Sequence, residues 1–345
     1  MRTIQQKVLE HYDIVGAKIE QFGSGLINDT FLVCLEDGHQ FILQGLNPIF
    51  DPEINIDIDR LTRHLSESGM ITKRILSTKD NKLWVNVDNQ NWRLSSYVSG
   101  VCIDLLETQE QAEAAGDLLG RFHYKIKDLK LNLHTSRLGV HDTELHLSLL
   151  EKALQRHSNH RYIDQIRPLA DAIFYEADNL PRLPDLPDRL VHGDPKISNL
   201  VFSEMDGSGV CMIDLDTLTY MPLALEMGDA FRSWCNPHGE DYDNSDFRLD
   251  FFETAINSYA KITRSFLQEL EWRSFVLGTR IIMVELAARF TTDALNESYF
   301  GWNPNLFEDR SKHNQVRAKG QLKLERSFTK QMDEAERIVE NAFSD

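Results

Sequence analysis

Cysteine is scarce in this sequence, and its positions follow no pattern that marks a metal site or a disulfide framework. The cysteines Cys34, Cys102, Cys211 and Cys235 are far apart, with no CxxC pair and no Cys/His spacing of the zinc-binding kind. The histidines do not form an HExxH pattern either. Because each cysteine has apolar neighbours in the sequence, we expect buried free thiols in a reducing compartment and no structural metal.

Basic residues are also in short supply. The 345 residues include 37 Lys and Arg against 54 Asp and Glu, which gives a formal net charge of −17. Binding to nucleic-acid phosphates depends on clustered basic side chains. The charge balance therefore argues against a nucleic-acid partner.

No long apolar run is present. A membrane-spanning helix needs about 20 predominantly apolar residues, and the best candidate, residues 275–288, is interrupted by Arg280 and Glu285. The first residues, MRTIQQKVLEHYDIV, have no apolar core of the kind found in signal peptides. We expect a cytoplasmic protein that has no membrane partner.

The residues that are present suffice for two domains, since 41% of them are apolar and domains average roughly 150 residues. Short apolar runs between turn residues predict strands at 17–23, 29–36, 40–46, 73–77, 83–88 and 91–98. Between them, Ile54, Ile58, Leu61 and Leu65 recur at helical spacing and predict one helix. Residues 1–99 are therefore predicted to form a small β-rich lobe.

From about residue 108 the apolar period becomes helical. Beyond a helix that carries Ala115 to Ile126, helices are predicted at 144–156, 161–177, 226–235, 247–260, 265–298 and 314–342. Short strands at 189–191, 200–203 and 210–213 interrupt them. The prediction is an α+β, bilobal protein-kinase-like fold in which residues 100–345 form the larger, mainly helical lobe.

The stretch LVHGDPKISNLVF, followed by SEMDGSG and VCMIDLDT, carries the clearest chemistry. A strand, a turn and a returning strand bring Asp214 close to Asn199 and Asp194. The spacing from His192 to Asp194 and Asn199 matches the catalytic loop of protein kinases, in which an Asp also follows a later apolar strand. Asp194 is predicted to accept the proton of an attacking hydroxyl, while Asn199 and Asp214 offer oxygen ligands to Mg²⁺.

Other polar residues around this motif have supporting roles. Lys196 is placed to reach the γ-phosphate of ATP as a point charge. Asp216 either contacts a second metal or only holds the loop, and His192 is expected to brace the loop backbone. Taken alone, HGD can be an ordinary polar turn and IDLD a strand end; the order of the two segments, with a hairpin between them, favours phosphoryl transfer.

A nucleotide site needs further contacts, and the first hundred residues offer two candidates. Gly23, Ser24 and Gly25, followed by Asn28, lie between two predicted strands, where small residues let backbone N–H groups approach phosphates. A GxG in a hairpin is by itself usually only a turn. Residues 93–100, with Tyr97 and Val98, form either a hinge whose main chain binds adenine or an ordinary edge strand.

The chain resembles the aminoglycoside phosphotransferase and choline kinase-like family of small-molecule kinases along nearly its whole length. Within that family it is most similar in its motifs to N-acetylhexosamine 1-kinases. The segments that carry this resemblance are GSGLINDTFLV (23–33), FILQGLNPIF (41–50), VHGDPKISNLVF (191–202), MIDLDT (212–217), GDAFRS (228–233), ARFTTDALNESYF (288–300) and HNQVRAKGQLKL (313–324).

The resemblance implies ATP- and Mg²⁺-dependent phosphorylation of a small-molecule hydroxyl, with the anomeric hydroxyl of an N-acetylhexosamine as the expected acceptor. Matching motif positions suggest Arg289 and Tyr299 as sugar-binding residues, with Arg232 as a weaker candidate. Each has a structural alternative: Arg289 can pair with Glu285 four residues earlier, and Tyr299 can be a core aromatic residue with an exposed hydroxyl.

The chain departs from protein kinases at two positions. The third strand reads FILQGL, with Gln44 where a lysine normally binds the α- and β-phosphates, and DLD replaces the usual DFG. Magnesium, Lys196 and the glycine hairpin are then expected to handle the phosphate charge. A basic segment at 310–330 is interpreted as a solvated helix face, with Arg317 or Lys319 near a phosphate as the alternative.

Two other functions remain open from the sequence. A kinase of amino alcohols or aminoglycosides would suit an acidic protein, because acidic clefts attract cationic acceptors. A catalytically silent nucleotide-binding module would explain the missing third-strand lysine, although Asp194, Asn199 and Asp214 are all present. The acceptor, the hydroxyl that is phosphorylated and the oligomeric state are not indicated by the sequence.

Overall fold

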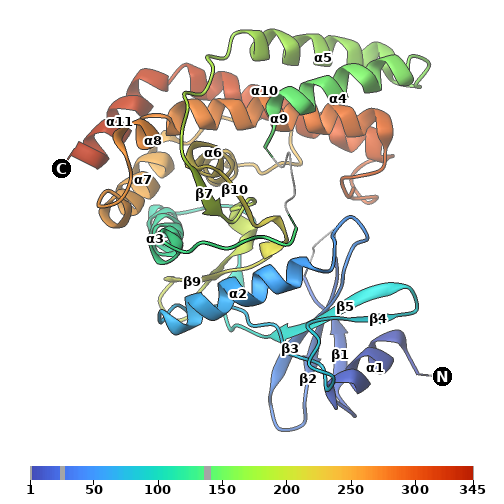
Figure 1. Cartoon of the computed structure of the whole chain (residues 1–345). Helices are drawn as coiled ribbons and strands as arrows, with labels where there is room; N and C mark the ends of the chain where they lie inside the picture. Colours follow the sequence, from blue (N-terminus) through green and yellow to red (C-terminus); the bar gives the residue numbers. More distant parts are fainter. Residues whose placement is uncertain (1, 24–27, 136–140, 345) are drawn as a thin grey trace. The chain divides into compact units, whose positions relative to one another are not determined.

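Two units make up the chain in this computed structural model, which describes residues 2–23, 28–135 and 141–344 (Figure 1). The first unit comprises Met1–Ser99 and Lys130–Ser136, and the second comprises Gly100–Leu129 and Arg137–Asp345. The first is rich in strands and the second is mainly helical. The α+β class expected from the sequence is therefore confirmed.

An antiparallel sheet is the framework of the first unit. In the described residues its strands, in sheet order, are β1 (Lys18–Gln21), β2 (Asp29–Cys34), β3 (Gln40–Gly45), β5 (Gln90–Ser96) and β4 (Val85–Val87). One face is covered by the short helices α1 (Ile4–Leu9) and η1 (Glu10–Tyr12). The buried side chains of this core include Val8, Val33, Leu43, Trp92 and Leu94.

Helix α2 (Ile54–Glu67) completes the first unit. It buries the expected apolar stripe of Ile58, Leu61 and Leu65, and it also buries polar residues such as Asp57. The Asp57 carboxylate accepts hydrogen bonds from the backbone N–H and ring Nδ1 of His134. This contact explains why residues 130–136 belong with the first unit although they follow residue 99 by some thirty positions.

The second unit contains the long helices. They are α3 (Gln109–Ile126), α4 (Thr143–Arg156), α5 (Ile163–Asp178), α6 (Leu223–Trp234), α7 (Leu249–Thr263), α8 (Glu269–Arg273), α9 (Phe275–Asn296), α10 (Arg310–Thr329) and α11 (Met332–Ser344). Helix α9 is buried on all sides, because α4, α5, α6 and α10 pack around it (Figure 1). Inside, its Arg280 pairs with Glu325 at 2.9 Å. Across the described ranges, no helix is long and apolar enough to cross a membrane.

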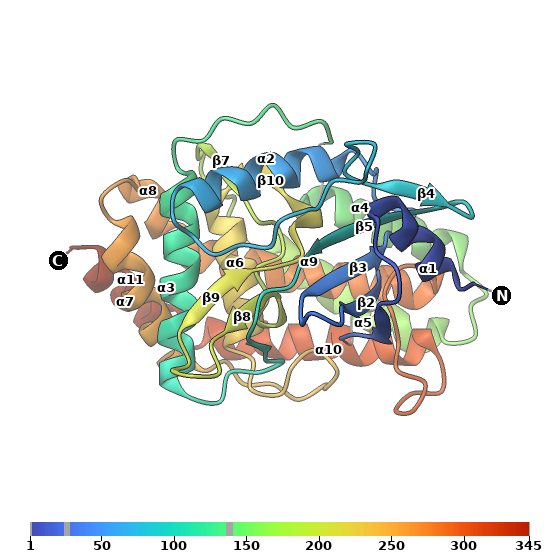
Figure 2. The ribbon, with the colours of Figure 1, turned by 90° about the horizontal axis from the view of Figure 1, so that it is seen from below.

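Short strands support one face of this unit. They are β6 (Val101–Cys102), β8 (Leu200–Phe202) and β9 (Gly209–Met212) in one sheet, and β7 (Asp188–Val191) with β10 (Thr219–Pro222) in another. The 3-10 turns η2 (Ile197–Asn199) and η3 (Leu215–Thr217) follow β7 and β9. Helix α3 runs beside β9 (Figure 2). These short strands position the polar loops described below.

Several local expectations were wrong. Residues 73–77 form no strand, since only Ile75 bridges to Ser95 before the chain turns at Thr78. The long helices expected at 265–298 and 314–342 are each broken, because α8 ends at Arg273 and α10 at Thr329. Cys211 and Cys235 are buried as expected, but Cys102 is exposed on a two-residue strand.

Helices α6 and α9 approach closely through two glycines. A Cβ atom at Gly278 would lie 2.0 Å from the carbonyl oxygen of Ala224, and one at Gly228 would lie 2.5 Å from the carbonyl oxygen of Gly278. Backbone atoms cannot yield as a flexible side chain can, so a methyl group at either position forces the helices apart. The short distance between α6 and α9 therefore depends on glycine at positions 228 and 278.

We expect Gly278→Ala to lower the free energy of unfolding by about 2–3 kcal/mol, as overpacking does in dense cores. Thermal or urea unfolding measures this change. Gly120→Ala on α3 is the matched control, because its Cβ would first meet the flexible Cδ1 of Ile262 at 3.3 Å. Equal stability of the two variants would contradict the prediction.

Candidate active site

The loop between β7 and β8 requires glycine at its second position. Gly193 has φ of 84°, and a Cβ there would lie 2.2 Å from the carbonyl oxygen of Thr217. The Thr217 hydroxyl donates a hydrogen bond to the carbonyl oxygen of His192 at 2.9 Å. The η3 turn thus packs directly against the loop that carries Asp194.

His192 braces the loop, as the sequence suggested. Its Nδ1 accepts the backbone N–H of Asp194 at 3.3 Å, and its Nε2 lies 2.8 Å from the carbonyl oxygen of Ile213. Both ring nitrogens thus contact backbone groups, and these contacts hold the His192 ring against the loop that carries Asp194.

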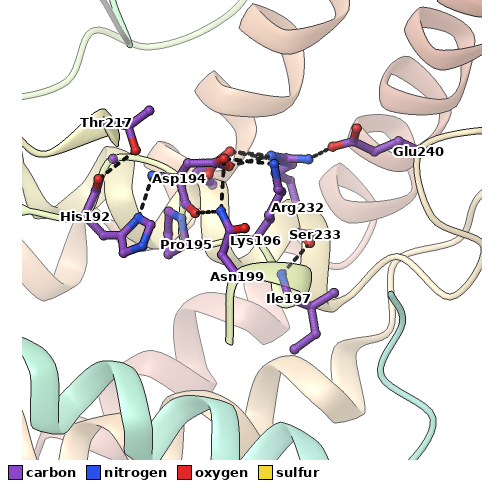
Figure 3. Close-up of polar contacts among 12 residues, drawn as sticks. His192, Asp194, Pro195, Lys196, Ile197, Asn199, Thr217, Arg232, Ser233 and Glu240 are labelled. Atoms are coloured by element: carbon purple, nitrogen blue, oxygen red, sulfur yellow. Dashed lines mark hydrogen bonds and ion pairs between the residues drawn. The ribbon is translucent and has the colours of Figure 1, made fainter. Parts of the chain in front are cut away.

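Asp194 lies among cationic and amide donors (Figure 3). Its Oδ2 accepts from Lys196 Nζ at 2.9 Å and from Asn199 Nδ2 at 3.1 Å, and its Oδ1 lies 4.0 Å from an Arg232 nitrogen. Burial raises the pKa of the Asp194 carboxyl, but the charges of Lys196 and Arg232 outweigh it and hold the pKa well below its usual range. The side chain is 21% exposed, so a ligand can reach an ionised carboxylate.

Lys196 remains a cation in this setting. Burial lowers the pKa of its ammonium group, but the charges of Asp194 and Asp214 more than compensate and raise it. Lys196 therefore lies within the electrostatic reach of both acidic residues. Its side chain is 31% exposed.

Asn199 and Asp214 are brought together by strand pairing. In the β8–β9 hairpin Leu200 pairs with Met212, and the N–H of Ile213 donates to the carbonyl oxygen of Asn199 at 2.9 Å. Asp214 is the next residue, and its backbone has φ of 64°, a left-handed conformation that residues other than glycine rarely adopt. Asn199 Nδ2 donates to the Asp194 carbonyl oxygen at 2.8 Å, which directs its Oδ1 away from the loop. Asp216 is buried in η3.

Glu226 on α6 is a site residue that the sequence reading missed. Its fully buried carboxylate accepts the backbone N–H groups of His192 at 3.0 Å and Gly193 at 2.9 Å. An acidic residue within the apolar run LALEM was the available signal. Two buried N–H groups at the start of the loop depend on this one side chain.

The same carboxylate is part of a buried network. His123 Nε2 lies 3.5 Å from Glu226, and His123 Nδ1 lies 2.8 Å from the hydroxyl of Tyr259. Burial raises the pKa of the Glu226 carboxyl, but the His123 contact and the loop N–H groups lower it by a larger amount. The pKa of Glu226 therefore lies below its ordinary value of 4.5. Glu226 is therefore ionised at neutral pH.

The end of α6 holds the rest of the loop. The Ser233 hydroxyl accepts the N–H of Ile197 at 3.1 Å (Figure 3). The Trp234 ring N–H donates to the Pro195 carbonyl oxygen at 2.9 Å. Arg232 pairs with Asp229 at 2.8 Å and with Glu240, while lying beside Asp194. A single helix thus positions the loop from residue 192 to residue 197.

A line of polar residues extends from Asp229 toward α9. The charge of Asp229 contributes to raising the pKa of His141, and His141 Nδ1 lies 3.0 Å from Glu285. Burial lowers the pKa of His141, but Glu285 raises it by more. Among the described residues, Asp229 Oδ2 and His141 Nε2 are buried and have no hydrogen-bond partner.

Arg289 and Tyr299, the predicted sugar-binding residues, both lie near one aromatic ring, that of Phe300. The Arg289 guanidinium is 5.8 Å from the centre of the Phe300 ring and 3.9 Å from Glu285, and the Tyr299 ring packs edge-on against Phe300 at 4.8 Å. Asp293 accepts the backbone N–H groups of residues 298–300 and so shapes this turn. Tyr299 is 39% exposed.

The predicted nucleotide-binding residues lie in the first unit. Gly23 and Asn28 lie at the ends of the connection between β1 and β2, and Tyr97 and Val98 follow β5 directly. Gly23 has φ of 76°, and Asn28 Oδ1 accepts the N–H of Asn47 at 2.8 Å. Ser24 and Gly25 lie outside the described residues.

The basic segment of α10 is partly internal. Arg317 is buried, with Nε donating to Asp241 at 2.8 Å and an Nη group donating to the carbonyl oxygen of Gly301 at 2.8 Å. These contacts tie α10 to two loops of the second unit.

The fold is that of kinase-like phosphotransferases. Residues 18–260 match the phosphotransferase enzyme family that includes the aminoglycoside phosphotransferases, which is most of the chain. The chain belongs to this family, and it is therefore an enzyme that transfers a phosphoryl group to a small-molecule hydroxyl.

Solved structures with the same fold cover almost all of the chain. An aminoglycoside phosphotransferase from Alicyclobacillus acidocaldarius is 14% identical, with 97% of this chain and 98% of that one covered and a TM-score of 0.63. A microcompartment-associated aminopropanol kinase is 15% identical, with 95% of this chain and 98% of that one covered and a TM-score of 0.64. An amicoumacin kinase in complex with AMP-PNP and Ca²⁺ is 12% identical, with 93% of this chain and 92% of that one covered and a TM-score of 0.64.

Proposed function

We propose that this enzyme is an ATP- and Mg²⁺-dependent kinase that phosphorylates the anomeric hydroxyl of an N-acetylhexosamine. The observation that carries the proposal is the ionised, accessible Asp194 carboxylate, flanked by Lys196 and Arg232 and adjoining Asn199. Two cations hold this carboxylate in place, and its partial exposure lets an acceptor hydroxyl reach it and be aligned by it.

Asp194 acts on the acceptor hydroxyl. It accepts a hydrogen bond from that hydroxyl and directs the oxygen at the γ-phosphorus; the new P–O bond forms as the bond to the β-phosphate oxygen breaks. Since the pKa of Asp194 is low, it takes the proton only after the attacking oxygen has begun to bond. Lys196 offsets the phosphate charge at the same position.

Asn199 and Asp214 are the residues that fit a magnesium ion. The Asn199 amide nitrogen is bound to the loop, which presents its Oδ1, and Asp214 adds a carboxylate one residue beyond the Asn199–Ile213 contact. In the part of the chain that the structure describes, no three His, Cys, Asp or Glu side chains form a metal cage. Two oxygen donors suit Mg²⁺, which proteins usually bind through one or two carboxylates plus substrate phosphates, and which neutralises phosphate charge.

The residues beyond Asp194 support an uncharged, hydroxyl-bearing acceptor. Asp229 is paired with Arg232, and Glu285 with His141 and Arg289, so a cation already offsets the charge of each carboxylate. Among the described residues, the buried Oδ2 of Asp229 and Nε2 of His141 have no hydrogen-bond partner. Sugar hydroxyls can form hydrogen bonds with both atoms. Leaving such atoms unpaired costs about 1–3 kcal/mol each.

The test is a substrate panel. Purified protein with ATP and Mg²⁺ should release ADP with N-acetylglucosamine or N-acetylgalactosamine at a rate far above that with choline, ethanolamine or kanamycin. Phosphorus NMR of the product should show coupling to the anomeric proton. An N-acetylhexosamine whose anomeric oxygen is methylated is the matched control and should not react.

Two outcomes would contradict the proposal in different ways. Turnover with an amine acceptor alone would reject the sugar and keep the kinase. Phosphorylation of the methyl glycoside would keep the sugar and reject the anomeric position.

A further inference from the structure

His141 and Asp229 are two buried polar side chains of the second unit, and each keeps one atom without a hydrogen bond. The side chains are 3% and 4% exposed. Among the described residues, neither His141 Nε2 nor Asp229 Oδ2 has a hydrogen-bond partner. Folded proteins pair nearly all of their buried polar atoms, with protein groups, ordered water or a ligand. Each of these two atoms therefore indicates a place for a ligand group or a water molecule.

The orientation of the His141 ring is fixed by Glu285 on α9. The ring Nδ1 lies 3.0 Å from Glu285 Oε1, and the Thr143 hydroxyl donates to Glu285 Oε2 at 2.8 Å. Burial raises the pKa of Glu285, but the charge of His141 and its hydrogen bond lower it by more, so the carboxylate is ionised and only accepts. Nδ1 therefore donates to Glu285, and Nε2 is the ring atom left for a ligand.

The charges around His141 favour a proton on Nε2 as well. Burial lowers the pKa of the His141 ring, but the charges of Glu285 and Asp229 raise it by more, against an opposite effect of Arg289. An imidazole ring that is protonated on both nitrogens donates from both. Nε2 is then a donor, whereas Asp229 Oδ2 is a carboxylate oxygen and accepts. The two atoms thus offer one donor and one acceptor.

Asp229 adjoins the reaction centre. Arg232 Nη2 lies 2.8 Å from Asp229 Oδ1 and 4.0 Å from Asp194 Oδ1, so one guanidinium nitrogen adjoins both carboxylates. Arg232 extends from Asp194 to Glu240 (Figure 3). The side chains of Asp194 and Arg289 are 21% and 19% exposed, so solvent reaches neighbours of both Asp229 and His141. An acceptor whose reacting hydroxyl lies at Asp194 therefore has its other polar groups close to Asp229.

We propose that His141 and Asp229 together bind one hydroxyl group of the acceptor sugar, other than the hydroxyl that is phosphorylated, with Glu285 as the positioning residue of the His141 ring. His141 Nε2 donates to the oxygen of this hydroxyl, and the hydroxyl donates its proton to a hydrogen bond with Asp229 Oδ2. This inference rests on the proposed function, because it takes the acceptor to be a sugar.

A hydroxyl group matches this pair of atoms, and an ammonium group does not. A hydroxyl accepts and donates, so it satisfies both atoms, whereas an ammonium group only donates. An ammonium group bound to Asp229 would leave His141 Nε2 unpaired and would face a like charge on the ring. The pair therefore selects acceptors that carry a second hydroxyl and disfavours amino alcohols such as choline and ethanolamine, which have only one.

The first test uses the wild-type enzyme and a set of deoxy sugars. In each of them one hydroxyl of N-acetylglucosamine, other than the anomeric one, is replaced by hydrogen. At least one deoxy sugar should have a kcat/KM roughly 10- to 100-fold below that of the parent sugar, the range for a buried group left unpaired. If every deoxy sugar reacts as well as the parent, the two atoms hold only ordered water and the inference is overturned.

The variant His141→Asn separates recognition of the sugar from folding. The asparagine amide nitrogen takes the place of Nδ1 and can still donate to Glu285, but nothing replaces Nε2. The KM for the sugar should rise roughly 10- to 100-fold with kcat little changed, because the lost contact is made equally before and during transfer. The KM for ATP should not change. His39→Asn is the matched control, because the His39 ring also lies 3.0 Å from a carboxylate but is exposed, and it should keep the wild-type constants.

The deoxy sugar found in the first test closes a cycle with His141→Asn. If its missing hydroxyl is the partner of His141, the variant and the wild type should have nearly equal kcat/KM on that sugar while they differ on the parent sugar. A purely structural role of His141 would lower kcat/KM by the same factor on every sugar, and that result overturns the inference.

The possible results separate the two proposals. If the wild type phosphorylates no N-acetylhexosamine, the proposed function fails and this inference fails with it. If the wild type phosphorylates the parent sugar but His141→Asn keeps the wild-type KM for it, the inference alone is overturned.

Discussion

Replacing Asp194 with Asn is expected to lower kcat by about 10²–10⁴-fold, the range for loss of a positioned general base. The amide keeps the size of the side chain but can neither take the hydroxyl proton nor hold Lys196 and Arg232 by charge. Affinity for ATP should change little, because Asp194 acts on the acceptor. Steady-state kinetics with the best acceptor of the panel, together with calorimetry for ATP, measure both effects.

The pKa of Asp194 adds a pH criterion. Since the neighbouring cations hold this pKa well below its usual range, Asp194 stays ionised at every pH where the protein is assayed. The acid limb of the wild-type rate profile should therefore not report the titration of Asp194.

Asp188→Asn, a substitution of an exposed residue on β7, is the control for Asp194→Asn and should keep the wild-type rate. An Asp194→Asn variant with more than about a hundredth of the wild-type kcat would remove this residue from the role of base.

Glu226→Gln should produce the largest loss of stability. Its carboxylate accepts two buried backbone N–H groups, whereas glutamine offers one oxygen and turns an NH₂ group toward the other N–H. We expect a loss of about 2–4 kcal/mol in the free energy of unfolding, typical of a disrupted buried charged network. At 2–4 °C per kcal/mol, Tm falls by roughly 5–15 °C.

The loss should depend on pH in a defined direction. The folded pKa of Glu226 lies below its ordinary 4.5, so its contribution to stability is complete above pH 4.5 and is lost as the pH falls through the folded pKa. The stability difference between wild type and Glu226→Gln should therefore shrink in acid.

Urea unfolding from pH 7 downward measures this difference. Glu253→Gln, an exposed change on α7, is the control and should alter stability by less than about 0.5 kcal/mol at any pH. A difference between wild type and Glu226→Gln that stays constant or grows below pH 4.5 would contradict the assignment. Glu226→Gln should also reduce kcat, because the start of the Asp194 loop loses its anchor.

Local patterns predicted most elements of this chain because their signals are short-range. The stripe from Ile54 to Leu65 became α2, and the hairpin after Asn199 brought Asp214 beside it as expected. The expectation failed at residues 73–77, where an apolar run pairs with β5 at one bridge only. Strand formation depends on a partner along the whole segment, and sequence periodicity does not report that partner.

The burial of single residues was harder to predict than the elements that carry them. Cys102 has apolar neighbours in the sequence but lies exposed on β6, because that strand is only two residues long. Arg317 belongs to a basic run that reads as a solvated face, yet it is buried against Asp241 and Gly301. Such outcomes depend on which elements pack together.

The sequence by itself determined the loop that carries Asp194 and Asn199, since a strand, a turn and a hairpin within about twenty residues bring its groups together. Only the tertiary structure decided what holds and complements that chemistry. Glu226 reaches the loop from 34 residues away, and Glu285 reaches His141 from 144 residues away. Contacts of this kind arise when separate elements pack, so they leave no periodicity or spacing in the chain, whereas hydrogen bonds within a hairpin are set by neighbouring residues.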